Sequence, residues 1–225
     1  MTSWFEQYKV DVPEGRSGAW AIEHFEITEK EAKFSQLRAA INTSGRGRSV
    51  TAGTYTNLVH YITSDQGLVS HVVTIMSDTE AEIRDHLQVI YKAKGDVLIH
   101  GLGIGMVARA CLLEPKIASM TVVELQPDVI KLVGPWLESI AVKANKKLTI
   151  IQGDAFNWKP PKGQRWDVVW HDIWNEICTD NLPQISKLHR RFGKLCNWQD
   201  SWSRELLQVY RREERKQEKA LEMWR

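Results

Sequence analysis

The 225-residue sequence is poor in cysteine, long apolar runs and net charge. Its three cysteines, Cys111, Cys178 and Cys196, are widely spaced and include no CxxC pair, which favours reduced thiols and argues against a disulfide framework or a metal site. The apolar runs are far shorter than the roughly 20 residues that cross a bilayer, so we expect no membrane span. The net charge of +2 is too small to support a nucleic-acid partner.

The first residues, MTSWFEQYKVDVPEG, lack the apolar core of a signal peptide. We therefore expect a cytoplasmic protein. With 43% hydrophobic residues, the chain can form a substantial core.

Residues 1–76 predict a small α+β region. A strand is expected at 19–27, and the Thr28/Glu31 capping box begins a helix over 28–41, with Phe34, Leu37 and Ile41 as its apolar stripe. A mobile loop with Arg46 and Arg48 should follow, where these arginines would steer an anionic substrate or simply be solvated. Strands at 55–63 and 68–76 around Asp65-Gln66-Gly67 predict an antiparallel hairpin.

Residues 77–202 predict a Rossmann-like domain, in which a mostly parallel sheet has helices on both faces. Its helix at 77–93 places Ile83, Leu87 and Ile90–Tyr91 on a buried stripe. Helical stretches alternate with strands, a pattern typical of an α/β fold. The strands are expected at 96–101, 119–125, 147–154, 165–173 and 193–199. Residues 203–225 predict a polar helix, either docked through Leu207, Tyr210, Leu221 and Trp224 or used as a homodimer contact.

The glycines after the first strand of this domain, Gly101, Gly103 and Gly105, predict a turn against which a ligand can lie closely. Glu124 ends the following strand, where a carboxylate would accept the hydroxyls of a ribose. With Ala108 these residues also satisfy a nicotinamide-dinucleotide pattern. A tight turn without a ligand is the alternative.

Together with Asp154 in "IIQGDAF" and the segment "RWDVVWHDIW", residues 77–180 resemble the class I S-adenosylmethionine-dependent methyltransferases, particularly their spermidine-synthase-like branch. The resemblance implies S-adenosylmethionine as cofactor, with Gly101, Gly103 and Gly105 at its amino-acid part, Glu124 at the ribose and Asp154 at the adenine amino group. His100 stands where many members have an acidic residue, and it would rebuild the amino-group contacts. The segment "WHDIW" also resembles uncharacterised bacteriophage proteins, which implies no activity.

The resemblance places Asp172 after the fourth strand, in the position of an acidic residue of the spermidine-synthase branch. Asp172 is our candidate for handling the acceptor's proton, with His171 as the second candidate. The alternative is that Asp172 caps a helix and His171 is a core residue. Six tryptophans near these strand ends either line an aromatic pocket or pack in the core: Trp158, Trp166, Trp170, Trp174, Trp198 and Trp202.

These features favour a methyltransferase that acts on a small-molecule acceptor of unknown identity. An aminopropyl transferase would need acidic groups for a polyamine, for which Asp78, Glu80 and Glu82 are available unless they only support a helix start. A nicotinamide-dependent oxidoreductase and a non-catalytic cofactor-fold module are the remaining alternatives. The departures from the family pattern are the absence of its Asp-Ser-x-Asp-Pro segment after Asp172 and a C-terminus too short for its usual strand hairpin.

Overall fold

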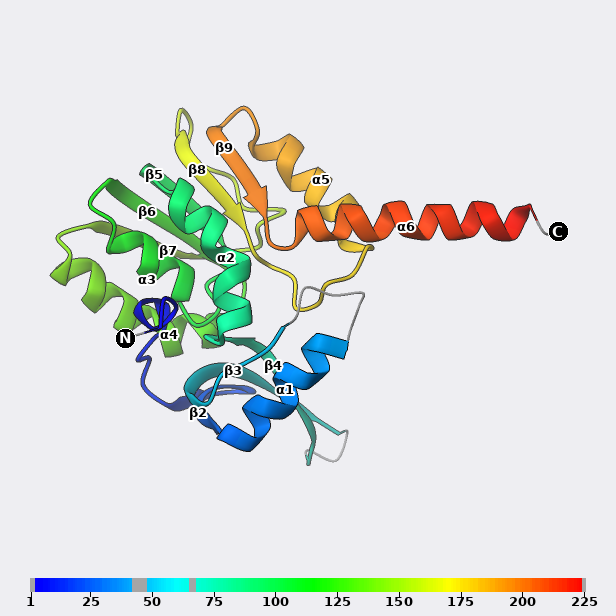
Figure 1. Cartoon of the computed structure of the whole chain (residues 1–225). Helices are drawn as coiled ribbons and strands as arrows, with labels where there is room; N and C mark the ends of the chain where they lie inside the picture. The colour runs from blue at the N-terminus through cyan, green and yellow to red at the C-terminus, as the bar shows by residue number, and fades with distance from the viewer. Residues whose placement is uncertain (1–2, 42–47, 65–67, 224–225) are drawn as a thin grey trace.

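An antiparallel sheet forms the N-terminal part of the computed structural model, which describes residues 3–41, 48–64 and 68–223 (Figure 1). Its strands lie in the order β1-β2-β3-β4. They are β1 (Gly15–Ser17), β2 (Trp20–Ile27), β3 (Gly53–Thr63) and β4 (Val69–Ser77), and the same region holds a short 3-10 helix (Glu6–Tyr8) and α1 (Glu29–Ile41). The predicted α+β region and the antiparallel pairing of β3 with β4 are confirmed. Arg46 and the turn at 65–67 lie outside the described residues.

Helix α1 shows where local sequence signals suffice and where they do not. The predicted capping box is present: the Thr28 main-chain N–H donates to the Glu31 carboxylate at 2.8 Å, and the Glu31 N–H donates to the Thr28 hydroxyl at 3.3 Å. The apolar residues at helical spacing do not form a buried face, because Phe34, Leu37 and Ile41 are 51%, 56% and 70% exposed. The cap fixes where the helix begins, but contacts with the rest of the protein decide which face is buried, and here that face holds Ala32.

The second sheet has five parallel strands in the order β7-β6-β5-β8-β9. They are β5 (Gly95–His100), β6 (Ile117–Glu124), β7 (Lys147–Gln152), β8 (Trp166–His171) and β9 (Cys196–Ser201). The chain builds outward from β5 in one direction through β6 and in the other through β8, so the strand order switches beside β5. In open α/β sheets, ligands bind beyond the carboxyl ends of the strands at such a switch.

Helices cover both faces of this sheet, as predicted. Val97 and Ile99 share a core with α2 (Glu80–Lys92), α3 (Met106–Leu112) and α4 (Pro127–Lys143). Leu98 points the other way, into a second core with Leu188 and Phe192 of α5 (Asn181–Phe192). On α2 the predicted stripe holds at Ile83 and Ile90 but not at Tyr91, which is exposed.

Helix α6 (Arg204–Glu222) projects from the body of the molecule (Figure 1). Leu207 near its start is buried, whereas Tyr210 is partly exposed and Leu221 is 67% exposed. The expectation of a helix docked along its length is therefore wrong beyond the first turns, and Trp224 lies outside the described residues. A homodimer contact through α6 stays a prediction. Across the described ranges, neither α6 nor any other helix is both long and apolar enough to cross a membrane.

Candidate functional site

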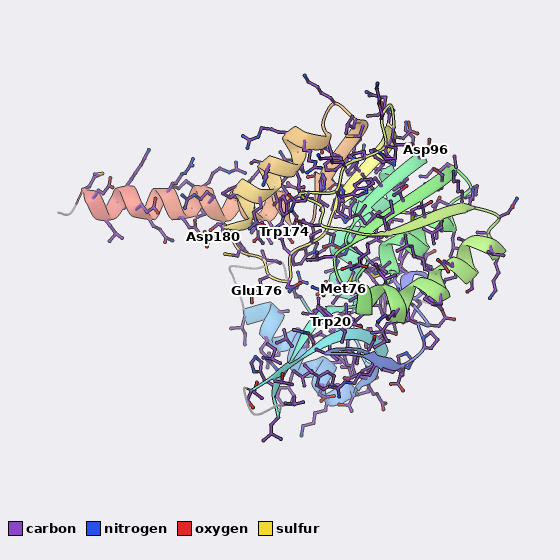
Figure 2. All side chains as sticks on the ribbon, turned by 180° about the vertical axis from the view of Figure 1, so that it is seen from behind. Trp20, Met76, Asp96, Trp174, Glu176 and Asp180 are labelled. Atoms are coloured by element: carbon purple, nitrogen blue, oxygen red, sulfur yellow. The ribbon has the colours of Figure 1, made fainter. Side chains whose placement is uncertain are left out.

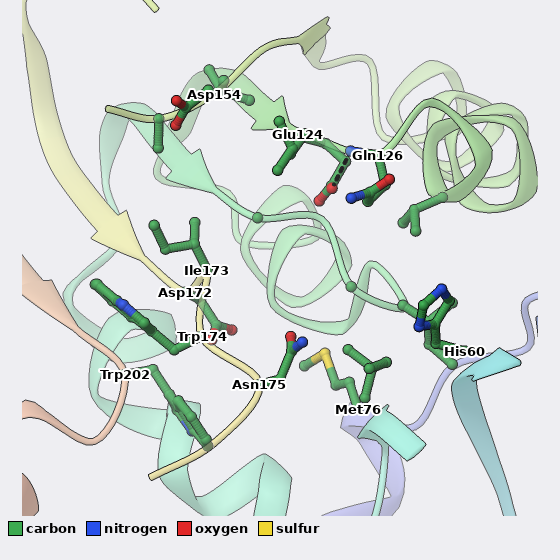
Figure 3. A pocket seen from close by; sticks show the side chains of 18 of the residues that line it. His60, Met76, Glu124, Gln126, Asp154, Asp172, Ile173, Trp174, Asn175 and Trp202 are labelled. Atoms are coloured by element: carbon green, nitrogen blue, oxygen red, sulfur yellow. Dashed lines mark hydrogen bonds between the residues drawn. The ribbon is translucent and has the colours of Figure 1, made fainter. Parts of the chain in front are cut away.

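A cavity of about 640 Å³ lies between the carboxyl edge of the parallel sheet and the N-terminal antiparallel sheet. Trp20, His60 and Met76 line it from the antiparallel sheet. Figure 2 shows Trp20 and Met76 facing the segment that carries Trp174 and Glu176. In Figure 3, Glu124 and Asp154 lie at one side of the cavity, with Trp174 and Trp202 across from them. The cavity thus occupies the place that the strand order indicates for a ligand.

The first two glycines of the predicted turn line the cavity. Gly101 has φ +94°, and a Cβ there would overlap the carbonyl oxygen of Asp172. Gly103 has φ +51°, and a Cβ there would overlap the sulfur of Met76. Both positions therefore favour glycine through their backbone conformation, and at Gly101 the close approach of the Asp172 main chain also leaves no room for a side chain.

Gly105 has a different role from the one predicted. It is the N-cap of α3 with φ +74°, and a Cβ there would lie 2.9 Å from Trp136 and 3.0 Å from Val133 of α4. It is not among the residues that line the cavity. Gly105 lets α3 and α4 pack closely, so the structure does not place it as a cofactor contact.

Glu124 joins the end of β6 to the glycine turn. Its carboxylate accepts the main-chain N–H of Leu102 at 2.7 Å and that of Gln126 at 2.8 Å. Burial raises the pKa of Glu124, and the two N–H donors oppose this rise. Because a carboxylate has about four acceptor positions, two remain for a ligand in the cavity that Glu124 lines.

Asp154 follows β7, the neighbour of β6, and also lines the cavity. One of its carboxylate oxygens accepts the Phe156 N–H at 2.8 Å, and the other binds the Asn157 side-chain amide. Ala155 and Phe156 line the same part of the cavity. The two acidic residues predicted at strand ends, Glu124 and Asp154, are thus brought to one site.

Asp172 lies at another part of the cavity and is paired with His86 of α2. The Nε2 atom of His86 lies 2.8 Å from Asp172 Oδ2, and its Nδ1 atom lies 2.7 Å from the carbonyl oxygen of Glu82. Both partners only accept hydrogen bonds, so both ring nitrogens must carry a proton and His86 is an imidazolium. Among the described residues no group donates to Oδ1 of Asp172, which leaves this oxygen for a ligand.

The charge of this pair follows from its surroundings. Burial alone would lower the pKa of His86, but the Asp172 carboxylate reverses this effect and raises the pKa to about 9. The nearby Glu82 carboxyl also lines the cavity, and burial raises its pKa while the His86 imidazolium opposes the rise. His86 is a residue that the sequence analysis missed. Its signal was a polar side chain on the buried stripe of α2, three residues after Ile83.

His171 and His100 do not belong to the cavity, which corrects their predicted roles in proton handling and cofactor binding. Both side chains are fully buried on the opposite face of the sheet, against Phe192 of α5. Their Nδ1 atoms are 2.8 Å apart and their rings are inclined by 7°, which at a centroid distance of 4.9 Å fits a hydrogen bond in the plane of the rings. Burial lowers the pKa of both, that of His171 to about 3, so the pair is neutral.

The physical reason for this correction is the alternation of a strand. His100 follows Ile99, and His171 follows Trp170, so both histidines face away from the core that contains α2. Of the six tryptophans, Trp174 and Trp202 line the cavity. The other four pack in the two cores. Asp78 and Glu80 also lie outside the cavity: Asp78 accepts the N–H groups of Val10 and Thr56, and Glu80 pairs with Arg84.

Comparison with known proteins finds similarity over part of the chain. No family model matches. Over 105 residues the chain is 35% identical to a polyamine aminopropyltransferase of Prochlorococcus marinus, which corresponds to 45% of this chain and 37% of that protein. Similar solved structures include the CcbJ methyltransferase from Streptomyces caelestis, with 19% identity, a TM-score of 0.38 and coverage of 50% of this chain and 44% of that one. An S-adenosylmethionine-dependent methyltransferase from Clostridium acetobutylicum has 16% identity, a TM-score of 0.34 and coverage of 52% and 44%.

Proposed function

We propose that this protein is an S-adenosylmethionine-dependent methyltransferase whose acceptor enters the same cavity as the cofactor. One observation carries the proposal: the glycine turn, Glu124, Asp154 and Asp172 come from the carboxyl ends of four neighbouring strands and line a single cavity. The resemblance to class I methyltransferases singles out these residues together with Gly105 and His100, which do not line the cavity.

The residues present fit the cofactor. The cavity volume of about 640 Å³ lies within the range of small-molecule sites. Glu124 has free acceptor positions for the ribose hydroxyls, Asp154 would accept from the adenine amino group, and the turn at Gly101 and Gly103 would hold the amino-acid part. Because His100 points away, the cofactor's ammonium group must find its acceptors among the lining residues, where Glu82 supplies a carboxylate.

The cofactor supplies a methyl group on a positively charged sulfur, and its transfer is an in-line displacement that depends mainly on alignment. In this protein, Asp172 would hold the acceptor's nucleophilic atom through Oδ1 and accept or orient its departing proton. His86 fixes the Asp172 carboxylate by occupying Oδ2. Trp174 and Trp202 add apolar walls that exclude water from this part of the cavity.

Calorimetric titration with S-adenosylmethionine and S-adenosylhomocysteine tests the proposal. We expect saturable binding of both ligands and its loss in Gly103→Val, because a branched side chain at φ +51° strains the turn that lines the cavity. Val142→Ala, an exposed change on α4 far from the turn, serves as the control. No heat and no thermal stabilisation of the wild type by either ligand at millimolar concentration would refute the proposal.

Aminopropyl transfer is the second candidate, favoured by the carboxylates of Glu82 and Asp172 in the cavity and by the 105-residue similarity to a polyamine aminopropyltransferase. A titration with decarboxylated S-adenosylmethionine, followed by a product assay with putrescine, separates the two. Methyl transfer predicts tighter binding of the intact cofactor. Preference for the decarboxylated form, with aminopropyl product, would replace the first proposal by the second.

A further inference from the structure

Exposed cations gather on one side of α5 and on the neighbouring segment 156–165. Lys187 and Arg190 lie on α5 opposite the buried residues Ile185, Leu188 and Phe192, and Lys194 lies in the turn that follows the helix. The segment 156–165 adds three more exposed cations. We call the six residues the basic face: Lys159, Lys162, Arg165, Lys187, Arg190 and Lys194.

Side-chain contacts hold the segment 156–165 against α5. The Arg191 guanidinium donates to the carbonyl oxygens of Phe156 and Trp158, and the Arg165 guanidinium donates to the carbonyl of Lys194 at 2.5 Å. The cations of the basic face therefore belong to one continuous surface, although they come from two parts of the sequence.

The charge of the basic face is not neutralised locally. Residues 156–165 and 181–195 contain no Asp or Glu, and no ion pair among the described residues involves a member of the basic face. Helix α6 differs, because Arg211 and Lys216 each pair with a carboxylate of the same helix and Arg204 pairs with Asp200 of β9. Arg190 in the last turn of α5 also complements the helix dipole, but this does not explain the cations of the segment 156–165.

The basic face begins at the rim of the cavity. Gln184 of α5 and Phe156 both line the cavity. Lys187 lies one helical turn beyond Gln184, with its ammonium group 5.2 Å from the centre of the Phe156 ring. A ligand that extends out of the cavity past Phe156 would therefore meet a row of unpaired positive charges.

We propose that the basic face binds single-stranded nucleic acid. Repeated phosphates match a row of unpaired cations, and the half-buried aromatic ring of Phe156, which lines the cavity, offers an apolar surface against which a base can pack. A single strand fits better than a duplex, because a base can enter a cavity between two sheets only when it leaves the stack. That a base is the acceptor rests on the proposed function, whereas binding along the basic face does not.

The small net charge of the chain, which argued against a nucleic-acid partner, is an average over regions of different sign. On the basic face the cations are unopposed, and about four phosphate contacts would make the affinity fall roughly 50-fold between about 50 and 200 mM salt. The local charge distribution, not the total, decides whether a polyanion binds.

Fluorescence anisotropy with labelled DNA and RNA single strands of about 20 nucleotides tests the proposal without any cofactor. We expect saturable binding at about 50 mM salt, and binding at least about tenfold weaker in K187E/R190E. The variant K159E/K162E, on the segment 156–165, should weaken binding in the same direction. The matched control R212E/R215E changes the net charge equally on α6, and its affinity should stay within about twofold of the wild type.

Circular dichroism establishes that each variant is folded. No binding of either single strand to the wild type at low salt would overturn the proposal, and so would equal losses in the basic-face and α6 variants. Binding to phosphatidylserine vesicles or to an acidic peptide, without binding to single strands, would likewise overturn it. S-adenosylmethionine titrations of K187E/R190E should match those of the wild type. Loss of nucleic-acid binding can therefore be distinguished from loss of cofactor binding, on which the proposed function rests.

Discussion

Two hydrogen-bonded pairs lie on opposite sides of the sheet at the end of β8 and differ in charge: His86 with Asp172, and His100 with His171. On the cavity side, His86 is held as an imidazolium by Asp172. On the closed side, His100 and His171 bond to each other and remain neutral. Burial lowers the pKa in both pairs, but only His86 has a carboxylate partner that reverses the effect. The partner, rather than burial or the residue type, therefore sets the charge of each pair.

Asp172→Asn removes the feature that distinguishes the two pairs and should have the largest effect. The amide no longer stabilises the His86 imidazolium, so the pKa of His86 should fall well below about 9. Methyl transfer should fall about a hundredfold or more while cofactor affinity stays nearly intact. NMR titration of His86 measures the first effect, and the methylation assay measures the second.

Two results would contradict this view of Asp172. An unchanged His86 titration in Asp172→Asn would refute the ion pair. A normal methylation rate with a lowered His86 pKa would show that the pair is structural and that another group handles the acceptor.

Glu124→Gln tests the ribose contact at the other end of the cavity. One amide oxygen cannot serve both backbone donors and a ligand, so cofactor binding should weaken by about 1 to 3 kcal/mol in calorimetry. Asp78→Asn is the matched control, because the Asp78 carboxylate also accepts two main-chain N–H groups but does not line the cavity. Equal losses of affinity in the two variants would indicate a general effect on the fold rather than a ligand contact.

The two pairs should also give stability opposite dependences on pH. His100 and His171 are neutral in the folded protein and have a pKa near 6.5 when unfolded, so their stability contribution is complete above about pH 6.5 and is lost as the pH falls toward 3. His86 contributes fully below about pH 6.5, and its contribution is lost as the pH rises through about 9. Each histidine changes the free energy of unfolding by up to about 1.4 kcal/mol per pH unit.

Urea denaturation across this pH range measures the free energy of unfolding in both the acid and the alkaline range. Asp172→Asn should remove the loss of stability at alkaline pH and keep the loss at acid pH. A wild-type stability that does not change between pH 4 and 6 would refute the neutral state of the closed pair.

The sequence located the elements more reliably than the directions of their side chains. Apolar runs indicated β5 and β8, and the residues after them indicated Asp172 and the glycine turn. Because both faces of these central strands are buried, no polar alternation revealed that His100 and His171 point away from the cavity. The contact between His86 and Asp172 joins positions 86 residues apart and required the three-dimensional fold. On α1, the helical spacing of apolar residues does not identify the buried face, because Phe34 is exposed.

Changes to the His100–His171 pair should have the smallest effect on cofactor binding. His100→Leu alone leaves the Nδ1 atom of His171 buried without a partner and should lower the free energy of unfolding by about 1 to 3 kcal/mol. The double variant His100→Leu/His171→Leu removes both rings and with them the unpaired Nε2 of His100. Only the half-buried side-chain oxygen of Gln199 loses a partner, so this variant should be closer to the wild type in stability at pH 7 than His100→Leu. The stability of the double variant should no longer fall at acid pH. Its cofactor affinity should stay within about twofold of the wild type, because neither histidine lines the cavity. Urea denaturation and calorimetry measure these quantities. A large loss of cofactor affinity in the folded double variant would show that the closed side of the sheet takes part in the site after all.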